Sequence, residues 1–167
     1  MPRLSLLTLT LALAACEKTR QTAFQPNQTL EDFSMSQSRR GKPGWTLSAH
    51  LGVLKEDRDE TLLTEPRMEF YQDGRVASKV ESRHGVVELA THDVLLSSSV
   101  VLTSVDENSV LTTDELKYSA AKAKFFTDKH IELRRPGTVL KGRGLEANAK
   151  LTEFRIYHQE SVVRDAR

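Results

Sequence analysis

The residues best suited to chemistry in this 167-residue chain do not form a recognisable catalytic or metal-binding motif. None of the histidines belongs to an HExxH helix motif, and each lies beside a turn or alternates outward from apolar neighbours. We therefore interpret them as surface residues rather than metal ligands, and we expect neither a metal nor another cofactor. The histidines are His50, His84, His92, His130 and His158.

Acidic and hydroxyl side chains are equally poor candidates for catalysis. The acidic cluster at residues 57–60 lacks the glycine and the later glutamate of a calcium loop, and the serines at 97–99 lack the G-x-S-x-G elbow of a nucleophile. A glycosidase pair could in principle come from Glu65, Glu69, Glu81 and Glu88. Glu69 and Glu88, however, alternate with inward-facing apolar residues and should point to solvent. We expect that the protein is not an enzyme.

The position of one cysteine does suggest chemistry. Residues 1–15 contain one positive side chain, Arg3, and then an apolar run that ends in small residues, which is typical of a secretory signal peptide. The run is too short to span a bilayer. Cys16, the only cysteine, directly follows the sequence Leu-Ala-Ala, an arrangement that resembles the lipobox of bacterial lipoproteins. We predict a lipid anchor on the Cys16 thiol; the alternative is an ordinary signal peptide followed by an unrelated cysteine.

Composition indicates one folded domain after this signal. The hydrophobic share of 38% is sufficient for a core, and the length suits a single domain. A formal net charge of +1 and an aromatic content of 6% argue against nucleic-acid binding, because few cations would displace counterions and few rings would stack on bases. We expect a lipoprotein signal peptide at residues 1–15, a lipidated flexible tether at 16–29 and one domain at 30–167.

Alternation of apolar and polar residues predicts an all-β fold for this domain. Every second residue is apolar in residues 45–53, and the one weak helix candidate, residues 114–123, suits a strand, a turn and a strand better. Turn signals such as Asp73-Gly74 and Pro136-Gly137 precede alternating segments, which recur about every 30 residues. These segments begin near Trp45, Val76, Val110 and Val139. We expect a dozen or more short antiparallel strands, stacked as an elongated sandwich or roll.

An inner layer of apolar side chains should lie between the two facing sheets of such a roll. Small residues among the larger ones leave room there, which either side chains or a ligand could occupy. The residues predicted for this inner face are Leu47, Ala49, Leu51, Met68, Phe70, Val87, Leu89, Ile131 and Leu133.

Several short segments along the chain together resemble one family. They are residues 45–49 (WTLSA), 65–68 (EPRM), 70–74 (FYQDG), 111–118 (LTTDELKY) and 140–146 (LKGRGLE). In this order, and behind a lipobox, these segments resemble the LptC family of the lipopolysaccharide export machinery, and more broadly the OstA-like repeat. The resemblance covers about residues 30–163.

The resemblance implies a twisted, open-ended β-jellyroll with an apolar slot that binds lipopolysaccharide acyl chains. It implies transfer of that lipid from the inner-membrane ABC transporter (LptB/LptF/LptG type) to a periplasmic bridge jellyroll (LptA type). The expected location is the cell envelope, as a periplasmic domain anchored through Cys16 to the inner membrane. The alternative function is that of a structural or interaction lipoprotein, which uses the β-roll as a scaffold for envelope assembly.

The resemblance also implies that the C-terminal segment, residues 139–157, is the edge that docks the next component, while the N-terminal edge faces the transporter. Leu140, Gly142, Gly144 and Leu145 are the predicted docking residues. Glycine within a strand marks either close backbone approach or a simple bulge. We predict that Gly142→Arg weakens partner binding and leaves the monomer folded.

Overall fold

The computed structural model describes residues 28–39 and 41–164 of the chain. These residues form eleven β-strands and no helix, and all strand pairs are antiparallel. The expected all-β fold is confirmed. The strands are β1 (Gln28–Arg39), β2 (Lys42–Lys55), β3 (Glu60–Thr64), β4 (Arg67–Gln72), β5 (Arg75–Glu81), β6 (His84–Glu88), β7 (Val94–Ser104), β8 (Ser109–Ser119), β9 (Lys124–Arg135), β10 (Thr138–Asn148) and β11 (Phe154–Arg164).

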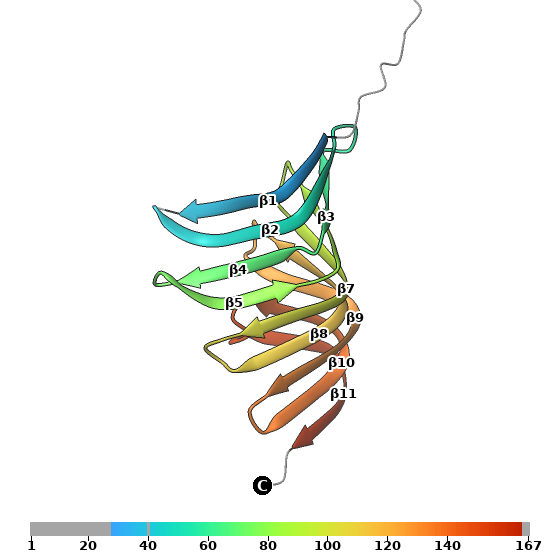
Figure 1. Cartoon of the computed structure of the whole chain (residues 1–167). Helices are drawn as coiled ribbons and strands as arrows, with labels where there is room; N and C mark the ends of the chain where they lie inside the picture. Colours follow the sequence, from blue (N-terminus) through green and yellow to red (C-terminus); the bar gives the residue numbers. More distant parts are fainter. Residues whose placement is uncertain (1–27, 40, 165–167) are drawn as a thin grey trace, which may run out of the picture.

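One continuous sheet is folded into two facing layers, because two of its strands change partners midway along their length. In β2, residues 45–48 pair with β4 and residues 51–55 pair with β3. In β7, residues 101–104 pair with β5 and residues 94–97 pair with β6. We call the layer that contains β4 and β5 the first layer, and the layer that contains β3 and β6 the second. The long strands pass through both, which gives an open, jellyroll-like shape (Figure 1).

The long strands bend where they pass from one layer to the other. In β7 the pairing with β8 is interrupted between Ser97 and Val100, and the two residues between them, Ser98 and Ser99, have φ values of 66° and 60°. In β10 the strand bends at Gly144, which has a φ of 76°. Such bulges bend a strand without ending it. The prediction of a dozen or more short strands is therefore wrong, because bent strands of up to 14 residues replace pairs of short ones.

Hairpin turns lie where the sequence predicted them. Asp73-Gly74 and Pro136-Gly137 connect β4 to β5 and β9 to β10, and Gly74 and Gly137 have the positive φ values that such turns require, 77° and 72°. Strands β5, β8 and β10 begin directly after their turns, so the predicted starts near Val76, Val110 and Val139 are correct. The strand, turn and strand reading of residues 114–123 is also correct.

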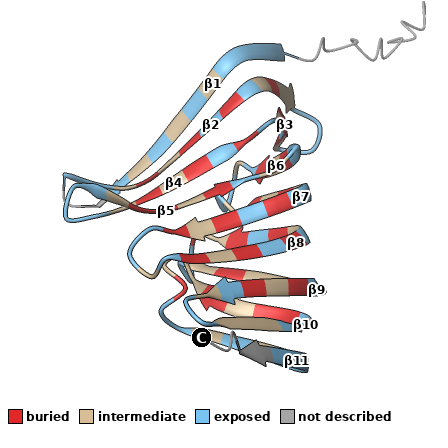
Figure 2. Ribbon diagram, turned by 60° about the horizontal axis from the view of Figure 1, so that its bottom comes forward, coloured by how far each residue is buried: buried red, intermediate tan, exposed pale blue. Residues whose placement is uncertain are grey.

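The core lies between the two layers, and alternation along each strand supplies it. Trp45, Leu47 and Ala49 of β2 are buried, while Ser48 and His50 are exposed. The same alternation of buried and exposed residues runs through most of the strands (Figure 2). The sheet thus has one face turned inward in both layers and one face turned to solvent.

The prediction that Leu51 lies on the inner face is wrong. Beyond the bend in β2, Gly52 pairs with Leu63, which is 3% exposed, whereas Val53 pairs with Leu62, which is 39% exposed. The inward positions therefore shift by one residue at the bend, and Leu51 lies on the outer face with Val53. A strict period of two could not predict this shift, because the bend is set by the change of pairing partner.

The two ends of the sheet are the strands β1 and β11, each of which pairs with one neighbour only (Figure 1). Strand β1 begins at Gln28, so the last two residues of the predicted tether already belong to the sheet. The predicted signal peptide and Cys16 lie outside the described residues. Among residues 28–39 and 41–164, no helix is long and apolar enough to span a membrane.

Candidate functional site

Most of the predicted inner-face residues lie in one buried cluster between the layers. Leu47 and Met68 are paired across β2 and β4, and both have 0% exposure. Leu89, in the turn after β6, packs against the margin of the cluster. The predicted residues that belong to the cluster itself are Leu47, Ala49, Met68, Phe70, Val87, Ile131 and Leu133.

Aromatic side chains from both layers fill the middle of this space. Phe70 of the first layer lies against two rings of the second, with its ring centroid 5.0 Å from that of Tyr118 and 5.4 Å from that of Phe125. Trp45 adds a further edge-on contact with Tyr118 at 6.3 Å. The room that the sequence predicted between the sheets is therefore occupied here by the protein's own side chains.

A row of buried serines continues the first layer beyond Phe70. Phe70 pairs with Ser78, Ser78 with Ser104, and Ser104 with Ser109, and all three serines are fully buried. The Ser104 hydroxyl accepts a hydrogen bond from the backbone N–H of Glu107, and the Ser109 hydroxyl donates to the Glu107 carbonyl. The Ser78 hydroxyl has no hydrogen-bond partner among the residues that the structure describes. Small side chains in this row leave width for the large rings of the second layer.

A pocket of about 360 Å³ opens where the layers separate, on the side away from the bends. We call it the mouth pocket. Its walls are mainly apolar, and its rim carries neutral amides and one cation, Lys150. The volume falls within the range of small-molecule sites. Its lining residues are Gln37, Gly44, Trp45, Phe70, Tyr71, Gln72, Ala77, Tyr118, Ala123, Asn148, Ala149 and Lys150.

One side-chain bridge crosses the rim of the mouth pocket. The Lys150 ammonium, in the turn between β10 and β11, donates to the side-chain carbonyl of Gln72 at the end of β4, at 2.5 Å. Asn148 holds the turn in place, because its side-chain oxygen accepts from the backbone N–H of Thr152 and its amide donates to the Thr152 hydroxyl. The bridge therefore joins the first layer to the second through a hydrogen-bonded turn.

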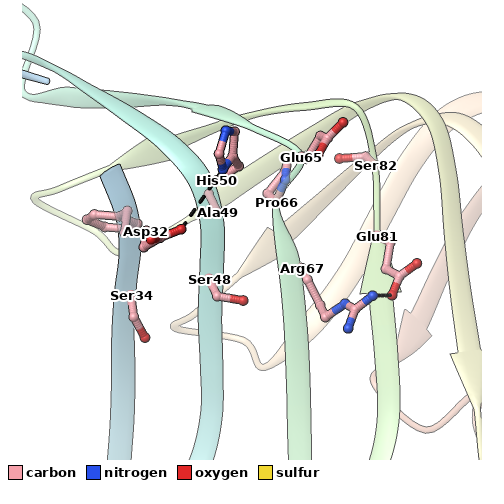
Figure 3. Close-up of a pocket in the computed structure, with 11 residues that line it drawn as sticks. Asp32, Ser34, Ser48, Ala49, His50, Glu65, Pro66, Arg67, Glu81 and Ser82 are labelled. Atoms are coloured by element: carbon pink, nitrogen blue, oxygen red, sulfur yellow. Dashed lines mark ion pairs between the residues drawn. The ribbon is translucent and has the colours of Figure 1, made fainter. Parts of the chain in front are cut away.

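A second pocket, of about 530 Å³, lies on the outer face at the bend, beside the terminal strand β1 and its neighbour β2. Figure 3 shows two ion pairs in it, Arg67 with Glu81 at 2.6 Å and Asp32 with His50 at 3.9 Å. These side chains are half or more exposed, so each pair contributes little to stability. Two of the acidic side chains in this pocket, Glu81 and Asp32, are thus already engaged by neighbouring side chains.

Ion pairs elsewhere on the second layer shift the pKa values of their members. The hydrogen bond from Lys124 lowers the pKa of Glu146 from its ordinary value of 4.5, and it raises the pKa of Lys124. Tyr157 also donates to Glu146, at 3.2 Å. In the first layer, hydrogen bonds from Lys141 and Arg134 lower the pKa of Glu132. These groups tie neighbouring strands together at the surface of the sheet.

The histidines lie at the surface, as predicted: His50, His84, His92, His130 and His158 are all exposed. Within residues 28–39 and 41–164, no three His, Cys, Asp or Glu side chains are grouped so that they could hold a metal ion. Glu88 is exposed, while Glu69 is partly covered and paired with Lys79.

The predicted docking residues of β10 require a correction. Strand β10 is paired on both sides, with β9 and β11, so it is not an edge. Leu145 is fully buried, and Leu140 packs against the core. A Cβ added at Gly142 would lie 2.5 Å from the carbonyl oxygen of His158, so this glycine does mark a close approach, but to β11 of the same chain. The C-terminal edge is β11 itself.

Both edge strands carry exposed apolar side chains. Leu30 of β1 is 39% exposed, and Tyr157 and Val162 of β11 are 53% and 43% exposed. An edge strand also leaves backbone N–H and C=O groups unpaired, which makes it a template for strand addition. The two ends of the sheet are therefore the surfaces best prepared for contact with another β-structure.

A protein-family comparison agrees with this architecture. The family model described as lipopolysaccharide-assembly, LptC-related, matches residues 4–163, which is nearly the whole chain. The chain belongs to the LptC-related family. Comparison with curated proteins found no match. Membership of the LptC family gives the chain a role in lipopolysaccharide transport, makes it a component of the cell envelope and confirms the family resemblance of its sequence segments.

The predicted inner face omits several residues that build the site in this LptC-related chain. The alternation along β8 could have identified Tyr118 as inward-facing, because it lies two residues after the buried Leu116. Phe125 is followed directly by Phe126, which hides the alternation. Gln72 and Lys150 carry no local signal, since their bridge joins positions 78 residues apart.

Proposed function

We propose that this LptC-related protein is a non-enzymatic carrier. It binds lipopolysaccharide acyl chains between its two layers and passes the lipid from the inner-membrane ABC transporter to the periplasmic bridge. The observation that carries the proposal is the inner apolar face, which runs from Met35 in β1 to Phe154 in β11 and is only partly buried at both ends. An apolar face that stays open at its ends suits a lipid that moves from one module to the next.

The energetics of lipid transfer favour such a face. Each exposed methylene of an acyl chain costs about 0.8 kcal/mol, so a chain of about a dozen carbons costs about 10 kcal/mol in water. A carrier must keep this surface dry while the sugars remain outside. Two apolar layers that open along one side meet this need without any reacting group, which is why no catalytic constellation is required.

Binding must compete with the side chains that fill the space. The rings of Phe70, Tyr118 and Phe125 meet between the layers. Tyr118 and Phe125 are paired across β8 and β9, but no strand pairing joins β4, which carries Phe70, to either of these strands. An acyl chain can therefore replace contacts between rings with contacts between rings and methylenes, at little cost in buried apolar area. We infer that the layers part at the mouth when lipid is bound.

Transfer to the next module would use the terminal strands. Strand addition at β11 would continue the apolar face into a bridge jellyroll of the LptA type, and β1 would face the transporter of the LptB/LptF/LptG type. The exposed side chains of Leu30, Tyr157 and Val162 support these two edges as the contact surfaces.

The predicted lipid on Cys16 would tether this carrier to the inner membrane. Replacement of Cys16 by Ser should move the protein from the membrane fraction to the soluble fraction of the periplasm. A Cys16→Ser variant that stays with the inner membrane after washing in high salt would contradict the anchor.

Site-specific photo-crosslinking in cells tests the carrier function. A photoreactive amino acid is placed at Met35 or Phe154, which face inward at the two ends of the sheet, or at their outward neighbours Ser36 and Arg155 as matched controls. We expect lipopolysaccharide adducts from Met35 and Phe154 and none from the controls. Because these positions lie at the ends rather than in the packed centre, the probes should leave the fold intact.

Two outcomes would contradict the carrier function. If folded variants with probes at both inner positions give protein adducts but no lipopolysaccharide adducts, the chain is a scaffold that assembles envelope components. Equal lipid adducts from Phe154 and Arg155 would indicate non-specific contact with the membrane and would also contradict the proposal.

A further inference from the structure

The mouth pocket combines an apolar interior with a cation that has no anionic partner. Lys117 pairs with Asp93 at 3.2 Å, and Lys124 pairs with Glu146. Lys150, by contrast, makes no ion pair among the described residues, and its ammonium is bonded to the neutral amide of Gln72. Two carboxylates lie nearby in the sequence, Asp73 next to Gln72 and Glu153 in the same turn as Lys150. Neither of them forms an ion pair with the Lys150 ammonium.

Gln72 offers the Lys150 ammonium only a neutral acceptor, so the ammonium remains able to bind an anion. An anionic phosphate oxygen attracts the charged ammonium more strongly than the neutral amide oxygen of Gln72 does, because the attraction is then between two full charges. Although the ammonium has three N–H donors, a phosphate that reaches the rim would compete with Gln72 for the position of Lys150. Loss of Gln72 as an acceptor would release the side-chain bridge that joins Gln72 and Lys150 across the rim.

The wall of the pocket suits an alkyl chain. Trp45, Phe70 and Tyr118 form the apolar floor, and their rings are the same ones that join the two layers. The indole N–H of Trp45 donates to the side chain of Gln37 at 2.8 Å, so the ring offers the pocket its apolar surface. An occupant must then have an apolar tail of small cross-section and an anionic head close to it.

We propose that the mouth pocket is the lateral entry site for one acyl chain of a phosphorylated amphiphile, with Lys150 exchanging Gln72 for the phosphate of the head group. The inference deepens the proposed carrier function and rests on it. Entry from the side, rather than from the ends of the sheet, follows from the place of the pocket between the layers. The bridge from Lys150 to Gln72 spans the rim of the mouth pocket until a suitable head group arrives.

Trp45 allows a direct test, because it is the only tryptophan in the chain and it lines the pocket. The probe is dodecyl phosphate, titrated below its micelle-forming concentration into the full-length chain with Cys16→Ser, so that no attached lipid competes. We expect a saturable change in Trp45 emission. Neutral dodecyl glucoside, with the same tail, should bind at least tenfold more weakly.

Two rim variants should have opposite effects. Lys150→Gln should weaken dodecyl phosphate binding about tenfold, because a charge-assisted hydrogen bond is lost. Gln72→Ala should strengthen binding two- to threefold, because the competing acceptor is gone. Lys117→Gln, whose ammonium is paired with Asp93 on the outer face, should bind as the parent does.

Three results would overturn the entry site: no saturable response to dodecyl phosphate, unchanged affinity in Lys150→Gln, or equal weakening by Lys150→Gln and Gln72→Ala, which would assign the bridge a purely structural role. Photo-crosslinking at Met35 and Phe154 keeps the two proposals separate. If those positions capture lipopolysaccharide while Lys150→Gln binds normally, the carrier function stands and the entry site fails.

Discussion

The ring of Phe70 in β4 lies 5.0 Å from the ring of Tyr118 in β8, centroid to centroid, with the ring planes at 64°. The edge-to-face contact joins two layers of a single folded sheet at the side where backbone hydrogen bonds do not connect them. It therefore marks both the centre of the packed core and the contact that a ligand between the layers must disturb.

Truncation of this contact should destabilise the fold strongly. We expect Phe70→Ala to lower the free energy of unfolding by about 3–5 kcal/mol, through lost burial and the cavity left beside Tyr118 and Phe125. Urea unfolding followed by circular dichroism measures the change. Val105→Ala, at a side chain that is 54% exposed, should change stability by less than about 0.5 kcal/mol. Similar losses for the two variants would contradict the central place of Phe70.

The unpartnered hydroxyl of Ser78 should be a source of instability. Ser78→Ala removes a buried polar atom without a hydrogen bond, so we expect the free energy of unfolding to rise by about 1 kcal/mol. Ser104→Ala is the matched control on the neighbouring strand. It should lower stability by about 1 kcal/mol, because the backbone N–H of Glu107 loses its acceptor. Destabilisation by Ser78→Ala would show that the hydroxyl has a partner in solution.

Gly142 should be required for the pairing of β11. A Cβ at this position would lie 2.5 Å from the carbonyl oxygen of His158 and 2.6 Å from a methyl carbon of Ile156. We expect Gly142→Ala to lower stability by about 1–3 kcal/mol and to expose the β11 amides to hydrogen exchange. This replaces the prediction that Gly142→Arg leaves the monomer intact.

Gly137→Ala provides the control for Gly142→Ala. Gly137 has φ of 72° but no atom within 4 Å of an added Cβ, so alanine there should cost about 1–2 kcal/mol of conformational strain and leave β11 protected. If both variants leave the β11 amides equally protected, the close approach at Gly142 does not control the terminal strand.

Acid should weaken the second layer through Glu146. The hydrogen bonds from Lys124 and Tyr157 lower the pKa of Glu146 in the folded state, so its contribution to stability is present above the unfolded pKa, near 4.5. That contribution is lost as the pH falls from there through the folded pKa. We expect the urea midpoint of the parent to fall more steeply below pH 4.5 than that of Glu146→Gln. Exposed Glu153→Gln should follow the parent, and parallel curves for all three would contradict the assignment.

Local patterns in the sequence predict much of this architecture. Alternation selects β-strands and places Leu47 and Met68 inward, because a strand exposes successive side chains on opposite faces. Turn chemistry places the hairpins at Asp73-Gly74 and Pro136-Gly137, because glycine accepts the positive φ of a tight turn. Both rules act over a few residues, so they can be read without knowledge of the fold.

Pairing between distant segments decides the rest. Leu51 leaves the inner face because β2 changes partners beside it, and Gly142 is internal because β11 covers β10. Neither event has a local sequence signal, since both depend on which strand arrives next to which.

The sequence by itself determined an all-β chain with alternating strands, glycine turns and the segments of the LptC family. Only the tertiary structure decided that Phe70 meets Tyr118 across two layers, that Lys150 reaches Gln72 over the mouth pocket, and that β1 and β11 are the open edges. The physical reason is that alternation and turns depend on near neighbours in the chain, whereas layers, pockets and edges arise when one sheet folds back on itself.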